Sequence, residues 1–329
     1  GGSTPKDLET LMQLIYLKLT NLTKDEKAVN NLINNQVTAL ANRSNNPQAV
    51  FQDSLTSTLY PGNPVFRTMT VDEVKSVNYD RALELGKQLF GNAKDYTFFF
   101  VGNFDEAKIL PLIEQYIASL PSNGKKFKNV ETLPVKGEVV NKFTKAMENP
   151  QDVALENWCS EAPYTLRNSV LADIAARVIN MDYNRNIREK LSAAYYAGAD
   201  AMESVKLDGK TMRVGFTGNA MMNPDKSKDA IPYFYSGLKD AMEQPNLDDL
   251  QKVKEILLKQ ADVSCKQNGY WMGVISEYLL HGIDTHTNYK KEVSSVDAKA
   301  VSDFLKNVVM KDGNHVEVIM HATKAGEAK

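Results

Sequence analysis

The sequence is poor in cysteine, has no long apolar run and carries no excess of either charge. Cys159 and Cys265 are its only cysteines, too few for a disulfide framework or a thiolate zinc site. We expect two buried free thiols, with one disulfide bridge as the alternative. Apolar stretches such as 98–101 are far shorter than the ~20 residues of a spanning helix. A net charge of −2 indicates neither nucleic acid nor an acidic membrane surface as a partner.

Histidine is also scarce, and its positions do not form a zinc-peptidase motif. His-Glu-x-x-His or His-x-x-Glu-His would place two imidazoles on one metal, but neither occurs among His281, His286, His315 and His321. Glu277 lies four residues before His281, and we expect a hydrogen-bonded surface pair there; the other three histidines are expected to be solvated or at strand ends. We therefore predict no metal ligands in this chain. Nucleophile elbows and phosphate-binding glycine loops are absent as well.

The length of 329 residues, of which 43% are apolar and 24% charged, is typical of a globular protein with two domains. A turn-forming stretch begins at Leu120-Pro121 and a lysine-rich polar run follows it. We therefore predict a first domain at 1–122, a linker at 123–135 and a second domain at 136–329.

The apolar spacing predicts mainly helices in the first half, with one buried strand at 96–101. In the second half it predicts strands near 139–147 and 153–158, then helices, then a strand starting at Tyr195. Asp208-Gly209 favours a tight hairpin turn before a further strand at 212–216. The second domain is therefore expected to contain a sheet and a layer of helices.

An internal repeat is the most informative feature below the level of motifs. Ser76-Val77 recurs as Ser295-Val296 at an offset of 219 residues, and Leu17-Lys18 recurs as Leu238-Lys239 at 221. We interpret this as a duplication, although leucine patterns of helices can also align by chance. Residue 1 then corresponds to about residue 221, so the first unit lacks about 86 residues of its start. We expect the complete protein to extend upstream.

The tract from Ile187 to Tyr196 places Arg188 in a helix and Tyr195 at the start of the following strand. Both side chains can donate hydrogen bonds to one extended peptide or to an oxyanion. In the alternative interpretation, Arg188 pairs with a nearby carboxylate and Tyr195 packs at a strand end. The spacing of the two residues does not decide between these interpretations.

This tract resembles the Leu-Arg-Glu-x-x-Gly-x-x-Tyr pattern in the C-terminal unit of the M16 (pitrilysin/insulinase) zinc peptidases. Further stretches also resemble the family, namely Asp7 to Leu17 and Phe98 to Asn103 with Leu110 to Pro121, and Trp271 is placed as in bacterial members. The resemblance covers nearly the whole chain, and it is to the C-terminal half, which lacks the zinc motif. The chain departs from the pattern at the glycine position, where Ser192 or Ala193 stands.

The resemblance implies an α+β fold of repeated two-layer units, each an antiparallel sheet with helices on one face, as in the LuxS/MPP-like metallohydrolases. It implies that Arg188 and Tyr195 orient the peptide and stabilise the transition state, and that Tyr196 contacts the substrate. Zinc would be bound by an N-terminal M16 half, in the same polypeptide or a partner subunit. The substrate would be a peptide or unfolded protein, and the bacterial relatives indicate the periplasm or cell envelope. This chain alone is then expected to be inactive.

Two alternatives remain open from the sequence. The fold also serves as a non-catalytic scaffold or partner subunit, as in processing peptidases and respiratory-complex core proteins. An exposed sheet edge can also bind peptides by strand addition, without zinc. The sequence does not reveal the identity of the substrate, the compartment or the oligomeric state.

Overall fold

The computed structural model describes residues 1–122 and 127–324, and their contacts divide the chain into two units. One unit comprises Gly1–Ser44 with Met69–Val130, and the other comprises Asn45–Thr68 with Glu131–Lys329. Residues 45–68 thus group with the later part of the chain. The predicted domains, 1–122 and 136–329, are repeats in the sequence, whereas these two units are defined by contacts, so the predicted boundaries stay a prediction. Part of the predicted linker, 123–135, lies outside the described residues.

The first unit is helical in its described part. Its helices pack around a small apolar core of Met12, Ile109, Ile117 and Leu120. Local sequence signals set the helix ends: Thr70 and Glu73 form a reciprocal capping box at the start of the fourth helix. The elements are η1 (Pro5–Asp7), α1 (Leu8–Thr20), α2 (Glu26–Arg43), α4 (Val71–Lys75), α5 (Tyr79–Phe90), η2 (Ala93–Asp95), α6 (Glu106–Leu112) and the π-helical η3 (Ile113–Ile117).

The prediction of a strand at 96–101 is wrong for this chain. Residues 96–101 belong to no helix or strand, and the isolated bridge described in this unit joins Asn92 to Ser122. A strand is stable only when neighbouring strands satisfy its backbone. The repeat counterpart, Glu317–Met320, does form a strand because it is paired on both sides.

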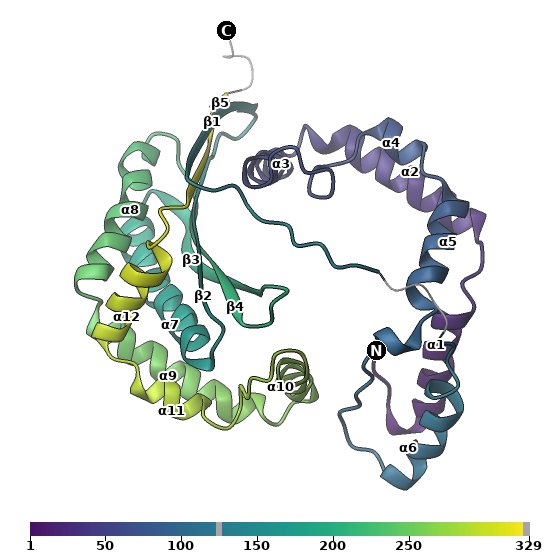
Figure 1. Cartoon of the computed structure of the whole chain (residues 1–329). Coiled ribbons are helices and arrows are strands. Elements are labelled where there is room, and N and C mark those ends of the chain that lie inside the picture. The colour runs from purple at the N-terminus through teal and green to yellow at the C-terminus, as the bar shows by residue number, and fades with distance from the viewer. Residues whose placement is uncertain (123–126, 325–329) are drawn as a thin grey trace. The chain divides into compact units, whose positions relative to one another are not determined.

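The second unit contains a five-stranded mixed sheet in the order β1-β5-β2-β4-β3 (Figure 1). β5 runs parallel to β1, whereas the β5–β2, β2–β4 and β4–β3 pairs are antiparallel. The predicted hairpin turn is confirmed, since Gly209 has a φ of 69° between β3 and β4. The strands are β1 (Glu138–Met147), β2 (Asp152–Pro163), β3 (Ala194–Val205), β4 (Thr211–Met222) and β5 (His315–Lys324).

Helices cover one face of this sheet and enclose the main core. Alternate residues of β4 point into it, so Met212, Val214 and Phe216 are almost fully buried. The largest side chains in this core are Trp158 and Tyr183. The helical elements are α7 (Leu166–Tyr183), the π-helical η4 (Asn184–Lys190), α8 (Ser227–Glu243), α9 (Leu247–Ser264), α10 (Asn268–His281), α11 (Tyr289–Ser295), α12 (Ala298–Phe304) and the π-helical η5 (Leu305–Val309).

α3 (Pro47–Leu59) packs on the opposite face of the sheet, beside β1 and β5 (Figure 1). Its Phe51 and Leu55 form a second core with Val316, Val318 and Met320 of β5. The α+β, two-layer fold is confirmed, with two refinements: the sheet is mixed rather than antiparallel, and one helix covers its second face.

The helices repeat along the chain as the sequence offset predicts. Each helix from α1 to α5 has a counterpart between α8 and α12 that begins 218 to 221 residues later. The starting residues are Leu8 and Ser227, Glu26 and Leu247, Pro47 and Asn268, Val71 and Tyr289, Tyr79 and Ala298. The repeated order supports the duplication.

Two further expectations concern single features. Cys159 and Cys265 are both free and partly buried, so the free-thiol interpretation is confirmed and the alternative of a bridge is not. Among the residues that the structure describes, no helix is long and apolar enough to cross a membrane.

Candidate functional site

The candidate site is built on the junction between η4 and β3 in the second unit. The buried Ile187 fixes η4 against the core, whereas Arg188, Glu189 and Lys190 are exposed. π-helical turns are frequent at functional sites because they redirect side chains. Similar π-helical turns also end α6 and α12, so this signal alone does not single out η4.

Tyr195 is directed outward by a β-bulge. In the β3–β4 register, Ala194 pairs with Met222 and Tyr196 with Met221, so Tyr195 is the extra residue. Its side chain is 75% exposed. Tyr195 therefore does not pack at the strand end, as the alternative interpretation supposed.

Arg188 is exposed, and within residues 1–122 and 127–324 its guanidinium has neither a hydrogen bond nor an ion pair. The arginine that pairs with a buried carboxylate is its neighbour Arg185, which binds Asp249. Pairing to a nearby carboxylate, the structural alternative for Arg188, is therefore not seen. The structure leaves the guanidinium of Arg188 and the hydroxyl of Tyr195 available to a ligand.

The turn between these two residues has an unusual backbone. Ser192 has a φ of 48° and is the one non-glycine residue with positive φ in the described part of the chain. Side chains with a Cβ rarely adopt this region, which favours glycine. Ser192, rather than Ala193, therefore occupies the backbone position for which the resembling pattern has glycine.

Tyr196 also depends on a glycine, which the sequence analysis did not identify. A Cβ added to Gly198 would lie 2.5 Å from the Tyr196 hydroxyl and 2.8 Å from Oδ1 of Asn180. Gly198 therefore lets the Tyr196 hydroxyl lie against the strand, although the residue stays 55% exposed. A glycine inside a strand is the available signal, because it often marks such a close approach.

The four histidines each have a structural neighbour instead of a metal partner set. Nδ1 of His321 lies 2.9 Å from Asp152, and Nε2 of His315 lies 2.6 Å from Glu156. Within the described residues, no group of three or more His, Cys, Asp or Glu side chains could hold a metal ion. The residues present therefore do not fit zinc, and that this chain binds none stays a prediction.

One histidine prediction needs correction. The expected pair of Glu277 and His281 is replaced by contacts with one tyrosine: Glu277 accepts a hydrogen bond from Tyr164, and the His281 ring packs edge-on against that ring. This tyrosine is distant in the sequence. His315 lies at a strand end as expected, since it opens β5, where it also stacks on Trp158 and bonds to Glu156.

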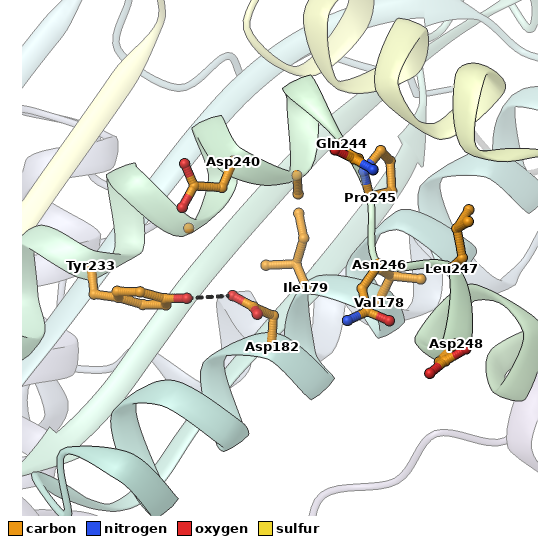
Figure 2. Close-up of a pocket in the computed structure, with 12 residues that line it drawn as sticks. Val178, Ile179, Asp182, Tyr233, Asp240, Gln244, Pro245, Asn246, Leu247 and Asp248 are labelled. Carbon is orange, nitrogen blue, oxygen red and sulfur yellow. Dashed lines mark hydrogen bonds between the residues drawn. The ribbon is translucent and has the colours of Figure 1, made fainter.

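A hollow of about 460 Å³ lies where α7, α8 and the start of α9 meet (Figure 2). Its wall carries the carboxylates of Asp182, Asp240 and Asp248. The Tyr233 hydroxyl donates to Asp182 across 2.8 Å, and burial raises the pKa of Asp182. None of the three predicted site residues lines this hollow, so we assign it no part in the site.

Comparisons with known proteins give information on the family and the fold of this chain. Residues 76–257, more than half of the chain, match the family described as "Peptidase M16 inactive domain". The chain is 23% identical over 282 residues to a protein named "Zinc protease PQQL-like" of Arabidopsis thaliana, covering 81% of this chain and 29% of the relative. It is 27% identical over 187 residues to "Probable zinc protease PqqL" of Escherichia coli, covering 56% of this chain and 20% of the relative.

The fold is similar to the crystal structure of the periplasmic protease PqqL from Escherichia coli. The TM-score is 0.83 at 18% identity, over 98% of this chain and 36% of that one. The chain thus spans less than a third of the length of the curated relatives named above.

Proposed function

Because this chain belongs to the M16 peptidases, matching the domain that the family calls inactive, we propose that it is the substrate-holding half of a zinc endopeptidase. The observation that carries the proposal is the availability of Arg188 and Tyr195. Both are exposed, on either side of a defined turn, and the structure gives them no partner in the described residues.

In this proposal the two side chains act on the peptide backbone near the cleaved bond. The guanidinium of Arg188 holds a carbonyl oxygen and orients the peptide, which lowers the entropic part of the barrier. The Tyr195 hydroxyl donates to the oxygen on which negative charge develops, and Tyr196 forms an adjacent contact surface for the peptide. Zinc would be held by an N-terminal M16 half, since the residues described in this chain do not fit it.

The substrate in this proposal is a peptide or unfolded protein, because Arg188 and Tyr195 address backbone groups that all peptides share. We propose the periplasm as the compartment, because the Escherichia coli protease PqqL, which has a similar fold, is periplasmic. The alternative of a zinc-free strand-addition module has less support. The backbone N–H of Ala199 on β3 already donates to Asn180 of α7 across 3.2 Å, which partly blocks that strand edge.

The test uses the full-length protein that contains this chain. Arg188→Ala and Tyr195→Phe should each lower kcat for peptide hydrolysis by about 10²- to 10³-fold, the usual cost of removing one transition-state donor. Zinc content, measured by elemental analysis, should stay unchanged. Lys190→Ala, on the same π-helical segment, and Tyr235→Phe, an exposed tyrosine of α8, are the matched controls.

Equal activity of the two site variants and the two controls would overturn the proposed role of Arg188 and Tyr195. A full-length protein without hydrolytic activity, and without a His-x-x-Glu-His segment in its upstream half or in a partner subunit, would favour the alternative of a non-catalytic scaffold or partner subunit of the same fold.

A further inference from the structure

The loop between β4 and α8 holds the turn that separates Arg188 from Tyr195. The backbone N–H of Asn223 donates to the Ala193 carbonyl across 2.8 Å. The ammonium of Lys226 donates to the carbonyls of Leu191 and Ser192 across 3.1 and 3.2 Å. Three consecutive carbonyls of the turn are thus bound by residues 30 to 35 positions later in the chain.

These contacts satisfy carbonyl groups at the end of η4 and hold a strained backbone conformation. Carbonyls at the end of a helical segment lack intrahelical donors and carry partial negative charge, so a lysine ammonium satisfies them well. The left-handed conformation of Ser192 costs about 1–2 kcal/mol for a residue with a Cβ. Such strain persists only where the surroundings fix the backbone, and Lys226 and Asn223 are those surroundings.

The position of Lys226 is itself fixed. The Asn223 side chain accepts from the Asp225 N–H across 3.0 Å, and the Lys226 N–H donates to the Asn223 carbonyl at the same distance. The next residue, Ser227, is buried and donates to Asp152 at the start of β2 across 2.6 Å. Lys226 is therefore anchored to the sheet rather than free to follow the turn.

We propose that Lys226 is a positioning residue that holds Arg188 and Tyr195 in their working arrangement by clamping the strained turn at Ser192. This role rests on the proposed function of the two side chains. Lys226 itself does not touch the substrate in this proposal. It acts through the backbone carbonyls of Leu191 and Ser192.

The experiment is a double-variant rescue in the full-length protein. Lys226→Met keeps the length of the side chain and removes its charge, so kcat should fall about 10- to 100-fold, the scale of a small misplacement of reacting groups. Lys226→Arg should retain most activity. Adding Ser192→Gly to Lys226→Met should restore kcat at least partly, because glycine adopts positive φ without strain.

Amide hydrogen exchange gives a readout that does not depend on activity. The Ala193 N–H, bonded to the Ile187 carbonyl, should exchange faster in Lys226→Met and regain protection in the double variant. Lys228→Met, an exposed lysine two residues later on α8, is the matched control and should change neither quantity.

Unchanged kcat and unchanged exchange in Lys226→Met would overturn the inference, as would a loss of kcat that Ser192→Gly does not relieve. A different outcome is faster exchange in Lys226→Met together with a kcat that is unchanged in Lys226→Met, Arg188→Ala and Tyr195→Phe. It would show that Lys226 does hold the turn and that the proposed function of Arg188 and Tyr195 is wrong. The two failures are therefore distinguishable.

Discussion

Nε2 of His315 lies 2.6 Å from Oε2 of Glu156, across the β5–β2 pair of the sheet. The carboxyl of Glu156 is 4% exposed, and the ring of Trp158 stacks on the imidazole at 5.1 Å between centroids. A partly buried acid–base pair thus lies inside the second unit. It makes the stability of this unit depend on pH.

Stability of the second unit should fall as pH rises from about 6 towards 8. The hydrogen bond to Glu156 raises the pKa of His315, against the opposing effect of burial. Burial also raises the pKa of Glu156, although His315 opposes that shift. Both groups therefore hold protons more tightly when folded. The contribution of His315 is complete below the unfolded pKa of histidine and is lost as pH rises through the folded value, and the raised pKa of Glu156 acts with the same sign in its own pH range. Urea denaturation at a series of pH values measures this.

The matched variant is His315→Gln, which keeps a hydrogen-bonding side chain and removes the titration. Its free energy of unfolding should vary less between pH 6 and 8 than that of the wild type. An identical slope for both proteins would show that another group controls the pH dependence.

Ser192→Gly should stabilise the chain by about 0.5–1 kcal/mol. It relieves a positive φ that costs about 1–2 kcal/mol with a Cβ, and the greater freedom of glycine in the unfolded chain offsets part of the gain. Ser192→Ala keeps the Cβ and should give no comparable gain. Urea denaturation of the three proteins tests this, and equal or lower stability of the glycine variant would argue against strain at this turn.

Gly218→Ala should destabilise the second unit by about 1–3 kcal/mol, the usual cost of overpacking a core. The added Cβ would lie 2.9 Å from the Phe234 ring and 3.0 Å from the Tyr183 ring, between β4 and the helix layer. The control is Gly215→Ala on the same strand, whose Cβ would be 3.7 Å from its nearest neighbour. Thermal unfolding should separate the two variants; similar melting temperatures would contradict the described packing.

Leu55→Ala should lower the free energy of unfolding of the second unit by about 2–5 kcal/mol, because this α3 side chain is buried against β5. The comparison is Leu32→Ala on α2, which is 58% exposed and should cost about 0.5 kcal/mol or less. Hydrogen exchange of β5 amides localises the effect. Unchanged exchange in β5 would mean that α3 does not support this sheet.

The sequence predicted the second unit well where local signals dominate. Alternation at Met212, Val214 and Phe216 and the Asp208-Gly209 turn define the β3–β4 hairpin without help from distant residues. The parallel pairing of β1 with β5 was not predictable in this way, since it joins segments about 177 residues apart. α3 was not predicted from the sequence, and its apolar residues Phe51 and Leu55 are buried by β5, a segment distant in the chain.

The candidate site was predicted in part. The residue types and the family resemblance identified Arg188, Tyr195 and Tyr196, and the structure shows that all three are exposed. The glycine position was left open between Ser192 and Ala193; the positive φ of Ser192 assigns it to Ser192, in agreement with the spacing from Arg188 and Tyr195. Lys226 carried no signal, because its role depends on a contact between distant segments.

The most direct test of the central claim compares peptide hydrolysis by this chain alone, incubated with zinc, with hydrolysis by the full-length protein at equal concentration. The account predicts no hydrolysis by the chain alone and zinc-dependent hydrolysis by the full-length protein. Robust zinc-dependent hydrolysis by the chain alone would contradict the account.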